Sequence, residues 1–479
     1  MQPTPVAGSL DLLVEGGTIV TLDPERRVLD DGAIAIRDGR IVAIGSPADL
    51  AARFPATARR LDTRGKVVYP GLVNTHTHLF QTLLKGLGDD RVLVEWFRQM
   101  TGPSAAALEE EDCYAAARAG CWEALRSGTT CLVDFMYVHP RPWLSDAVIR
   151  GMQESGIRGV FARGYCDTGV EEGVPPPLVQ PLDAILADCE RVATRYHGAA
   201  DGRIQVRFAP CMIWTVSEAS LRELRDLAAR LRVGLTMHVA ETPFEIENSQ
   251  RRFGMHDIAV LDRLDLLSPD LLAVHCVYLD PSDVELVGRR RAAVSHNPTS
   301  NMYLSSGVAP IPSLLRAGVA VGLASDGPAS NNTHNMIQSL KFGALLHKAV
   351  TRDPTVITGE TVLEMATIGG ARALGLESEI GSLEVGKRAD LFVADLASSP
   401  FAAPVHHPVS ALVYSAAGTE VETVVVDGRV VLDQGHLTTL DEDEVRTAAQ
   451  MAADRLTRRA GTEALRRRAW RSVACAPLA

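Results

Sequence analysis

The chain has 479 residues, of which 46% are hydrophobic and 22% charged, and its formal net charge is −11. This composition excludes an intrinsically disordered chain, which combines low hydrophobicity with dense charge. The acidic balance disfavours nucleic acid and anionic membranes as partners, because both repel negative charge.

Both ends of the chain alternate apolar and polar residues in short runs separated by Gly, Asp and Pro. Near the N-terminus the runs include GAIAIRDG and RIVAIGS, and near the C-terminus ADLFVADL and VETVVVDGRVVLDQG. Such alternation is typical of antiparallel strands joined by tight turns. We expect one composite β-sandwich domain built from residues 1–68 and 390–440.

Between these ends, eight short apolar runs recur, and a helical pattern follows each of them. The runs are 68–76, 129–135, 159–164, 204–210, 233–239, 271–276, 292–297 and 319–326. Repeated βα units indicate a parallel sheet, and eight of them predict a (β/α)8 TIM barrel. The barrel is expected to span 69–389, followed by a C-terminal helical segment over 441–479.

Polar residues gather at the ends of the predicted barrel strands, where a TIM barrel places its chemistry. Strand one ends in His76 and His78, strand five in His238, strand six in His275, strand seven in His296 and strand eight in Asp326. Any one of these residues alone is more often structural than functional. Their common placement predicts an active site at this end of the barrel.

Four of these residues have the chemistry of a metal site. His76 and His78 are two apart, so on a strand both side chains point to the same face. With His238 and Asp326 they supply three imidazoles and a carboxylate, a set suited to Zn²⁺ or Fe²⁺. We expect one Zn²⁺ per chain, with Fe²⁺ as the alternative. A metal in such a site lowers the pKa of a bound water toward about 7.

Three residues are candidates for moving protons around that water. Glu241 follows the His238 ligand by three residues and could take a proton from the water and return it to a substrate nitrogen. His275 could orient the water, and Asp326 could help to pass the second proton to the leaving group. These assignments are hypotheses from spacing.

The motifs that carry these residues resemble those of the amidohydrolase superfamily, in particular its mononuclear metal aminohydrolases. They are PGLVNTHTHLFQTLLKG (70–86), HVAET (238–242), AVHCVYL (273–279), SHNPTSNMYLSSGVAP (295–310), SDGPASNNTHNM (325–336) and IGSLEVGKRADL (380–391). The resemblance covers about residues 10–440. It implies the same barrel, the same four ligands, Glu241 as general acid and base, and an assisting His275.

Other branches of that superfamily bridge two metals with a carbamylated Lys at the end of strand four. Here strand four ends in Phe208, Ala209 and Pro210, and none of the five Lys lies there. One metal is therefore the better interpretation.

The resemblance implies an amino-substituted heterocycle as substrate and ammonia as product. THTHLFQTLLKG resembles enzymes of oxopurines, pterins and triazines, in which the residue at Gln81 reaches ring heteroatoms, and Cys211 fits the same group. GLGDDRVLVEWF resembles instead the deaminases of methylthioadenosine and S-adenosylhomocysteine. A free heterocycle is the main prediction, an adenosine derivative the alternative, and a triazine hydrolase that removes chloride or alkylamine also stays open.

Further substrate contacts are predicted from side-chain type. Arg163 could hydrogen-bond a substrate carbonyl through its planar fork, or form a salt bridge at the barrel mouth. Trp96, Trp214 and Met302 could line an apolar slot for a flat ring. Asn301 is expected to brace the loop after strand seven.

A binding protein that has lost catalysis is the competing class of function. Such relatives typically lose metal ligands, and this sequence retains all four together with Glu241. We therefore expect an enzyme, with a small heterocycle as its partner and a homodimer or higher homo-oligomer as its assembly. The absence of a visible signal peptide and of any CxxC pair favours a cytoplasmic location.

Overall fold

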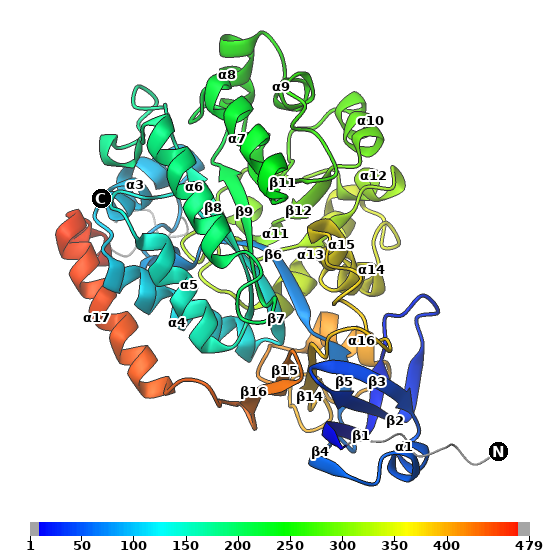
Figure 1. Ribbon diagram of the computed structural model, residues 1–479. Coiled ribbons are helices and arrows are strands. Elements are labelled where there is room, and N and C mark those ends of the chain that lie inside the picture. Colours follow the sequence, from blue (N-terminus) through cyan, green and yellow to red (C-terminus); the bar gives the residue numbers. More distant parts are fainter. Residues whose placement is uncertain (1–8, 468–479) are drawn as a thin grey trace, which may run out of the picture.

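The computed structural model describes residues 9–467 and contains two sheets, a parallel one of eight strands and a mixed one of nine. The parallel strands, in spatial order, are β6 (Leu72–Thr77), β7 (Thr129–Met136), β8 (Arg158–Tyr165), β9 (Ile204–Pro210), β10 (Gly234–Val239), β11 (Leu271–His275), β12 (Ala293–His296) and β13 (Val321–Leu323). Helices surround this sheet (Figure 1). The predicted (β/α)8 barrel is confirmed.

The barrel strands are buried along almost their whole length. All eight residues of β7 and of β8 are buried, as expected for parallel strands that are covered on both faces. The first and last strands also meet, because the Asp326 N–H donates to the carbonyl oxygen of His76 (3.1 Å) and Thr75 Oγ1 donates to that of Leu323 (3.1 Å). The barrel is therefore nearly closed.

The helices after the strands form the outer layer. They are α4 (Glu110–Arg126), α5 (Leu144–Ser155), α6 (Leu182–Tyr196), α7 (Glu218–Leu231), α8 (Pro243–Phe253), α9 (Asp257–Arg263), α10 (Pro281–Arg290), α11 (Pro298–Tyr303), α12 (Ile311–Arg316), α13 (Met336–Thr351), α14 (Gly359–Met365) and α15 (Ile368–Leu374). Between β6 and α4 lie η1 (Leu79–Leu84), α2 (Leu93–Trp96), η2 (Phe97–Thr101) and α3 (Gly102–Ala106). This long insertion covers one side of the barrel mouth.

The mixed sheet combines both ends of the chain, as predicted. Its strands are β1 (Leu10–Val20), β2 (Val28–Arg37), β3 (Arg40–Gly45), β4 (Thr57–Asp62), β5 (Val67–Pro70), β14 (Leu391–Ala394), β15 (Val421–Val426), β16 (Arg429–Asp433) and β17 (His436–Leu437). β5 pairs with β14 and so joins the two ends. The predicted antiparallel pairing is found between β1, β2 and β3 and along β5, β14, β15, β16 and β17, whereas β1 pairs in parallel with both β4 and β5. β1 is long enough to hold these two short strands one after the other along a single edge.

The run predicted as the first barrel strand belongs to both sheets. β5 ends at Pro70 in the mixed sheet, and β6 begins at Leu72 in the barrel. A Cβ at Gly71 would lie 2.0 Å from Thr130 Oγ1, so only glycine fits at this crossing. One apolar run can therefore serve two sheets, a division that periodicity alone does not reveal.

The two sheets are also linked by a buried ion pair. Arg158, at the start of β8, donates from Nε to Oδ2 of Asp390 (2.8 Å) and from Nη2 to its Oδ1 (3.0 Å), and both residues are at most 5% exposed. Arg158 Nη2 also lies 3.4 Å from Oδ1 of Asp427. This bidentate pair fixes the barrel to the mixed sheet.

The C-terminal part of the described chain is helical. α17 (Glu442–Ala460) packs along α4, and Arg118 of α4 makes two hydrogen bonds to Glu444. The last residues of the predicted helical segment, 468–479, lie outside the described residues. Three short helices, α1 (Pro47–Arg53), α16 (Pro408–Ser410) and η4 (Ala411–Ser415), complete the elements near the mixed sheet.

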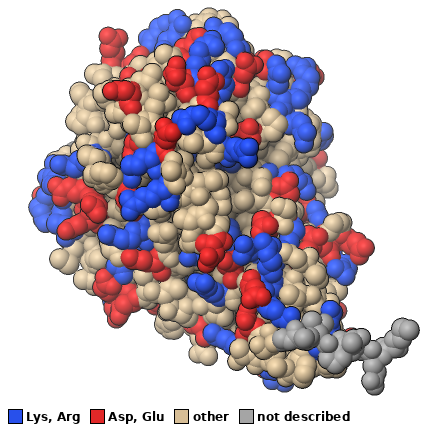
Figure 2. Space-filling view, in the orientation of Figure 1, with Lys and Arg blue, Asp and Glu red and all other residues tan. Residues whose placement is uncertain are grey.

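The surface carries mixed charge. Acidic and basic side chains alternate over the face in Figure 2 without a continuous basic patch. None of the helices within residues 9–467 is long and apolar enough to cross a membrane. The seven Cys in the described residues are free and buried.

Candidate metal and active site

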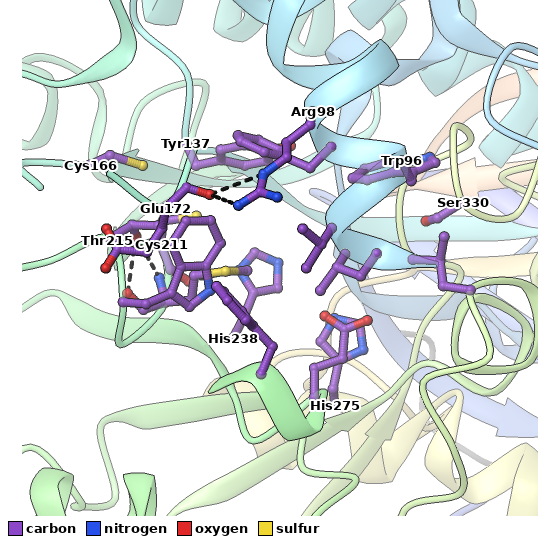
Figure 3. Close-up of a pocket in the computed structure, with 18 of the residues that line it drawn as sticks. Trp96, Arg98, Tyr137, Cys166, Glu172, Cys211, Thr215, His238, His275 and Ser330 are labelled. Atoms are coloured by element: carbon purple, nitrogen blue, oxygen red, sulfur yellow. Dashed lines mark hydrogen bonds and ion pairs between the residues drawn. The ribbon is translucent and has the colours of Figure 1, made fainter. Parts of the chain in front are cut away.

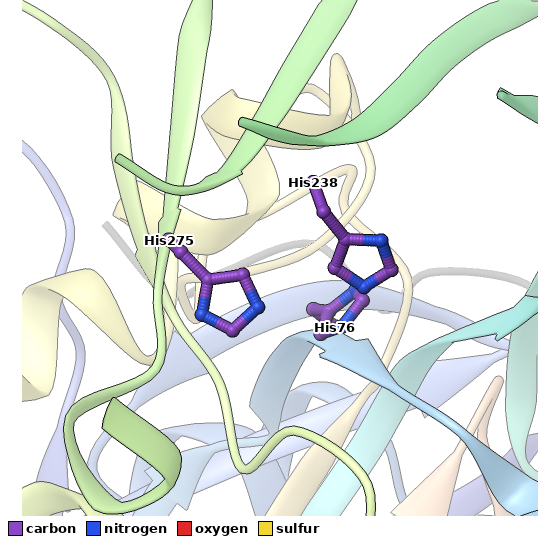
Figure 4. A group of neighbouring side chains, drawn as sticks. All are labelled: His76, His238 and His275. Atoms are coloured by element: carbon purple, nitrogen blue, oxygen red, sulfur yellow. The ribbon is translucent and has the colours of Figure 1, made fainter. Parts of the chain in front are cut away.

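Five polar side chains meet at the carboxyl ends of the barrel strands. His76 Nε2 and His78 Nε2 lie 3.3 and 3.4 Å from Oδ1 of Asp326. The rings of His76 and His238 are 5.0 Å apart, and those of His238 and His275 are 5.5 Å apart. Figure 4 shows His76, His238 and His275 around a common centre. The structure therefore brings together the four predicted ligands, with His275 beside them.

Backbone carbonyls orient two of the imidazoles. His78 Nδ1–H donates to the carbonyl oxygen of Phe135 (2.6 Å), and His238 Nδ1–H donates to that of Cys211 (2.8 Å). With the proton held on Nδ1, the Nε2 lone pair of each ring remains available to a cation. This is the usual support of a metal-binding histidine.

The protonation states also suit a cation. Burial lowers the pKa of His76 to about 4 and that of His78 to about 3, so both rings are neutral at pH 7. Burial alone would raise the pKa of Asp326, but the surrounding imidazoles bring it well below its usual value. Among the described residues, neither ring nitrogen of buried His76 has a hydrogen-bond partner. A buried, unsatisfied imidazole beside a carboxylate fits a bound metal ion.

The backbone is strained where this site is built. His275 has φ = 72° and Asp326 has φ = 58°, both in the left-handed region that non-glycine residues rarely occupy. Such conformations each cost on the order of 1–3 kcal/mol and collect at functional sites. They turn the chain sharply at the strand end, which aims these side chains across the barrel mouth.

Glu241 faces His275 on one side of the cluster. Its Oε2 lies 3.5 Å from His275 Nε2, and both residues are about 2% exposed or less. Burial raises the pKa of Glu241, while His275 and a hydrogen bond from Ser306 oppose that rise. A carboxyl group with a raised pKa can both accept and donate a proton near neutral pH.

A pocket opens above the cluster, and most of its walls are apolar. The lining includes Leu93, Val94, Trp96, Phe97, Leu178, Cys211, Met212, Trp214, Phe244 and Leu304, together with His78, His238, Glu241, His275 and Asp326. In Figure 3, His238 and His275 lie at one end, Trp96 and Ser330 on one side, and Cys211 on the opposite side. The predicted contacts Trp96, Cys211 and Trp214 therefore line the same pocket as the cluster.

Three other predicted substrate contacts are not among the residues that line this pocket. Gln81 is fully buried and donates to the hydroxyl of Tyr137 (3.4 Å). Arg163 is buried and forms an ion pair with Asp188 (2.7 Å). This is the salt bridge predicted from the sequence as the alternative to a substrate contact. Met302 is 38% exposed. The structure gives these three side chains other surroundings.

Two residues, Asn301 and Ser306, form hydrogen bonds, not predicted from the sequence, to candidate catalytic side chains. Asn301 Oδ1 accepts a hydrogen bond from His275 Nδ1 (2.8 Å), so it holds a candidate catalytic ring as well as its own loop. Ser306 donates to Oε1 of Glu241 (2.9 Å) and had no predicted role. The SSG triplet after a short helix marks a turn, but nothing in it indicates a carboxylate 65 residues away.

Comparisons with known proteins agree with this architecture. A family model described as the amidohydrolase family matches residues 67–431, and one described as an imidazolonepropionase-like composite domain of bacteria matches residues 32–56. A 5-methylthioadenosine/S-adenosylhomocysteine deaminase of Syntrophobacter fumaroxidans is 42% identical over 91% of this chain and 96% of its own. A 5'-deoxyadenosine deaminase of Methanosarcina acetivorans is 38% identical over 94% and 99%.

Solved structures show the same likeness. An adenosine deaminase from Xanthomonas campestris with bound zinc has a TM-score of 0.88 and 34% identity, covering 95% of this chain and 100% of its own. A zinc complex of an atrazine chlorohydrolase from Arthrobacter aurescens has a TM-score of 0.83 and 26% identity, covering 92% and 100%. The family model spans most of the chain, and the relatives match along nearly their whole length. The chain belongs to the amidohydrolase family.

Proposed function

We propose that this protein is a metal-dependent hydrolytic deaminase, which replaces an exocyclic amine on a nitrogen heterocycle with oxygen and releases ammonia. The observation that carries the proposal is the contact between buried Glu241 and His275, 3.5 Å apart, beside a cluster of metal-ligand type. An apolar pocket for a flat ring opens directly onto these groups.

His76, His78, His238 and Asp326 are the proposed ligands of a single Zn²⁺. A bound divalent cation of this kind supplies Lewis acidity and lowers the pKa of a water molecule, which makes a nucleophile available at neutral pH. The neutral imidazoles and the ionised carboxylate described above are the forms that bind a cation. Fe²⁺ suits the same donors.

Glu241 is the proposed proton carrier of the reaction. It removes a proton from the attacking water and delivers it to the ring nitrogen next to the reacting carbon, while the water oxygen adds to that carbon. His275 stabilises the oxygen as it adds. Asp326 accepts the second proton and passes it to the leaving amine, so the tetrahedral adduct collapses to a carbonyl and ammonia. His275 Nε2 lies 3.5 Å from Glu241 Oε2 and 4.0 Å from Asp326 Oδ2, so the three groups are close enough to act on one substrate.

Adenosine derivatives are the first candidate substrates, because the two relatives above are named as deaminases of such compounds. A free heterocycle is the second candidate, and the pocket supports it. Glu172, the remaining acidic residue of the lining, pairs with Arg251 (2.9 Å), and most of the other lining residues are apolar, which favours a flat ring without hydroxyl groups.

A substrate panel tests the proposal. Ammonia release is measured with 5'-methylthioadenosine, S-adenosylhomocysteine, 5'-deoxyadenosine, an oxopurine, a pterin and an aminotriazine, and chloride and alkylamine release with substituted triazines. Turnover of any amino compound supports deamination, and its efficiency across the panel ranks nucleoside against free ring. Release of chloride or alkylamine alone would replace deamination with triazine hydrolysis.

Removing the metal is expected to abolish turnover. Dialysis against a chelator should leave a folded, inactive protein, since the barrel core does not depend on the cluster. One equivalent of Zn²⁺ should restore activity and raise the free energy of unfolding, by about 2.7 kcal/mol at a free concentration 100 times Kd. Metal analysis and thermal unfolding measure both effects. Full activity after verified metal removal would reject the metal site.

Trp214 is expected to bind substrate through its indole N–H. The residue is 6% exposed and lines the pocket, and its Nε1 has no hydrogen-bond partner among the residues that the structure describes. In Trp214→Phe we expect KM to rise by up to about tenfold with little change in kcat, the value of one neutral hydrogen bond.

Trp96 offers a matched comparison for that variant. It lines the same pocket, but its Nε1 already donates to the carbonyl oxygen of Ala329 (2.8 Å). Trp96→Phe loses this internal hydrogen bond, so we expect a lower unfolding temperature. We expect KM to stay near the wild-type value, because this indole N–H is not available to the substrate. An unchanged KM in Trp214→Phe would show that the substrate does not use the indole.

A further inference from the structure

One short segment holds two groups that the proposed reaction uses, Glu241, which carries a proton, and His275, which stabilises the added oxygen. The segment is α11 with the turn that follows it. Ser306 Oγ–H donates to Oε1 of Glu241 (2.9 Å), and His275 Nδ1–H donates to Oδ1 of Asn301 (2.8 Å). All four side chains are at most 3% exposed. Water therefore does not compete for these two hydrogen bonds.

The end of α11 places Ser306 beside Asn301. Ser305 follows the helix with φ = 56°, and the N–H of Ser306 donates to the carbonyl oxygen of Asn301, five residues back (2.8 Å). This is the Schellman arrangement of a helix C-terminus, in which a left-handed residue folds the chain back onto the last turn. The two side chains are thus presented from one compact, hydrogen-bonded end.

The contacts make the two oxygens of Glu241 unequal. Oε1 accepts the Ser306 hydroxyl, whereas Oε2 lies 3.5 Å from His275 Nε2. The carboxamide oxygen of Asn301 can only accept, so His275 carries a proton on the Nδ1 that meets it. Glu241 Oε2 and His275 Nε2, the two atoms that this segment does not hold, therefore face each other.

We propose that Ser306 is a positioning residue that fixes the rotation of the Glu241 carboxylate, so that Oε2 is the oxygen that carries the proton. The inference rests on the role proposed above for Glu241. The terminal torsion of a glutamate is broad, so without the hydroxyl the carboxylate samples orientations in which neither oxygen meets the substrate nitrogen. Proton transfer then loses its prearranged geometry.

Ser306→Ala tests the proposal. We expect kcat to fall about tenfold, the worth of one buried hydrogen bond to a charged group, with KM changed by less than about twofold. Metal content should stay at the wild-type value, and the unfolding temperature should fall by no more than a few degrees, as expected for one lost buried hydrogen bond. Ser306→Thr, which keeps the hydroxyl, should bring kcat back to within about threefold of wild type. Ser305→Ala, at the exposed neighbouring serine, should leave kcat unchanged.

Three outcomes would overturn the proposal: wild-type kcat in Ser306→Ala, a loss of kcat that Thr does not restore, or a loss that follows metal content. If Ser306→Ala does not fold, Ser306→Cys decides, because it keeps the volume but donates weakly. An intermediate kcat supports positioning, and a wild-type kcat rejects it. Glu241→Gln is measured alongside. An active Glu241→Gln rejects the proposed function itself, whereas an inactive one with fully active Ser306→Ala rejects only the role of Ser306.

Discussion

Glu241→Gln is expected to lower kcat by about 10² to 10⁴-fold, the contribution of a positioned general acid and base. The amide has nearly the same shape and can still accept the hydrogen bond from Ser306, but it cannot take up a proton. Metal content should stay at the wild-type level, because the proposed ligands are other residues. Steady-state kinetics with metal analysis on the same preparation measure both quantities.

Glu245 provides the control for this variant. It is fully buried, its Oε2 accepts the N–H of Glu241 (3.1 Å), and burial raises its pKa well above the usual value. Because burial favours the protonated form of Glu245, we expect Glu245→Gln to change the local charge little and to keep kcat within about threefold. Equal losses in both variants would assign the effect to local structure and reject proton transfer by Glu241.

Arg158→Met is expected to lower the free energy of unfolding by about 3–5 kcal/mol. The substitution leaves Asp390 buried and without its bidentate partner, and an uncompensated buried charge is costly. Burial alone would lower the pKa of Arg158, but the neighbouring Asp390 raises this pKa above its usual value. The ion pair therefore stabilises the charged form of the arginine. Urea unfolding measures the loss, and kinetics of the folded fraction should stay at wild-type values because the pair is at the opposite end of β8 from the pocket.

A second substitution separates charge from packing. In the double variant Arg158→Met, Asp390→Asn the buried charge is gone while an oxygen remains to accept the N–H of Asp427, so part of the stability should return. Arg446→Met, which breaks an exposed pair with Asp443, should have no measurable effect. A double variant as unstable as the single one would mean that packing, not the stranded carboxylate, explains the loss.

The fold was largely predictable because the apolar runs in the sequence coincide with the strands that are buried in the barrel. The predicted run 204–210 coincides with β9 as observed, and 129–135 differs from β7 by one residue. Parallel strands are apolar throughout, so their runs are visible without an alignment. The prediction failed at Gly71, where one such run divides between two sheets, since periodicity carries no information on which sheet a strand joins.

The part of the candidate site that lies at the ends of the barrel strands was predictable from the sequence. His76, His78, His238 and Asp326 lie together because parallel strands end on one rim. Their metal binding and the catalytic roles remain predictions, which the experiments above test. The substrate contacts predicted for Gln81 and Arg163 were not found, because both side chains lie near the rim but bind Tyr137 and Asp188 instead. Such choices depend on the tertiary neighbours of a side chain.

The mixed sheet has a consequence for how the protein is made. Its central pairing joins β5, which ends at Pro70, to β14, which begins at Leu391. At about 5–20 residues per second, a ribosome needs on the order of tens of seconds to synthesise the intervening chain. During that time β5 presents an open edge that invites pairing with other chains. We expect nascent chains truncated before Leu391 to bind chaperones or aggregate, and completion of this sheet to be a late event in folding.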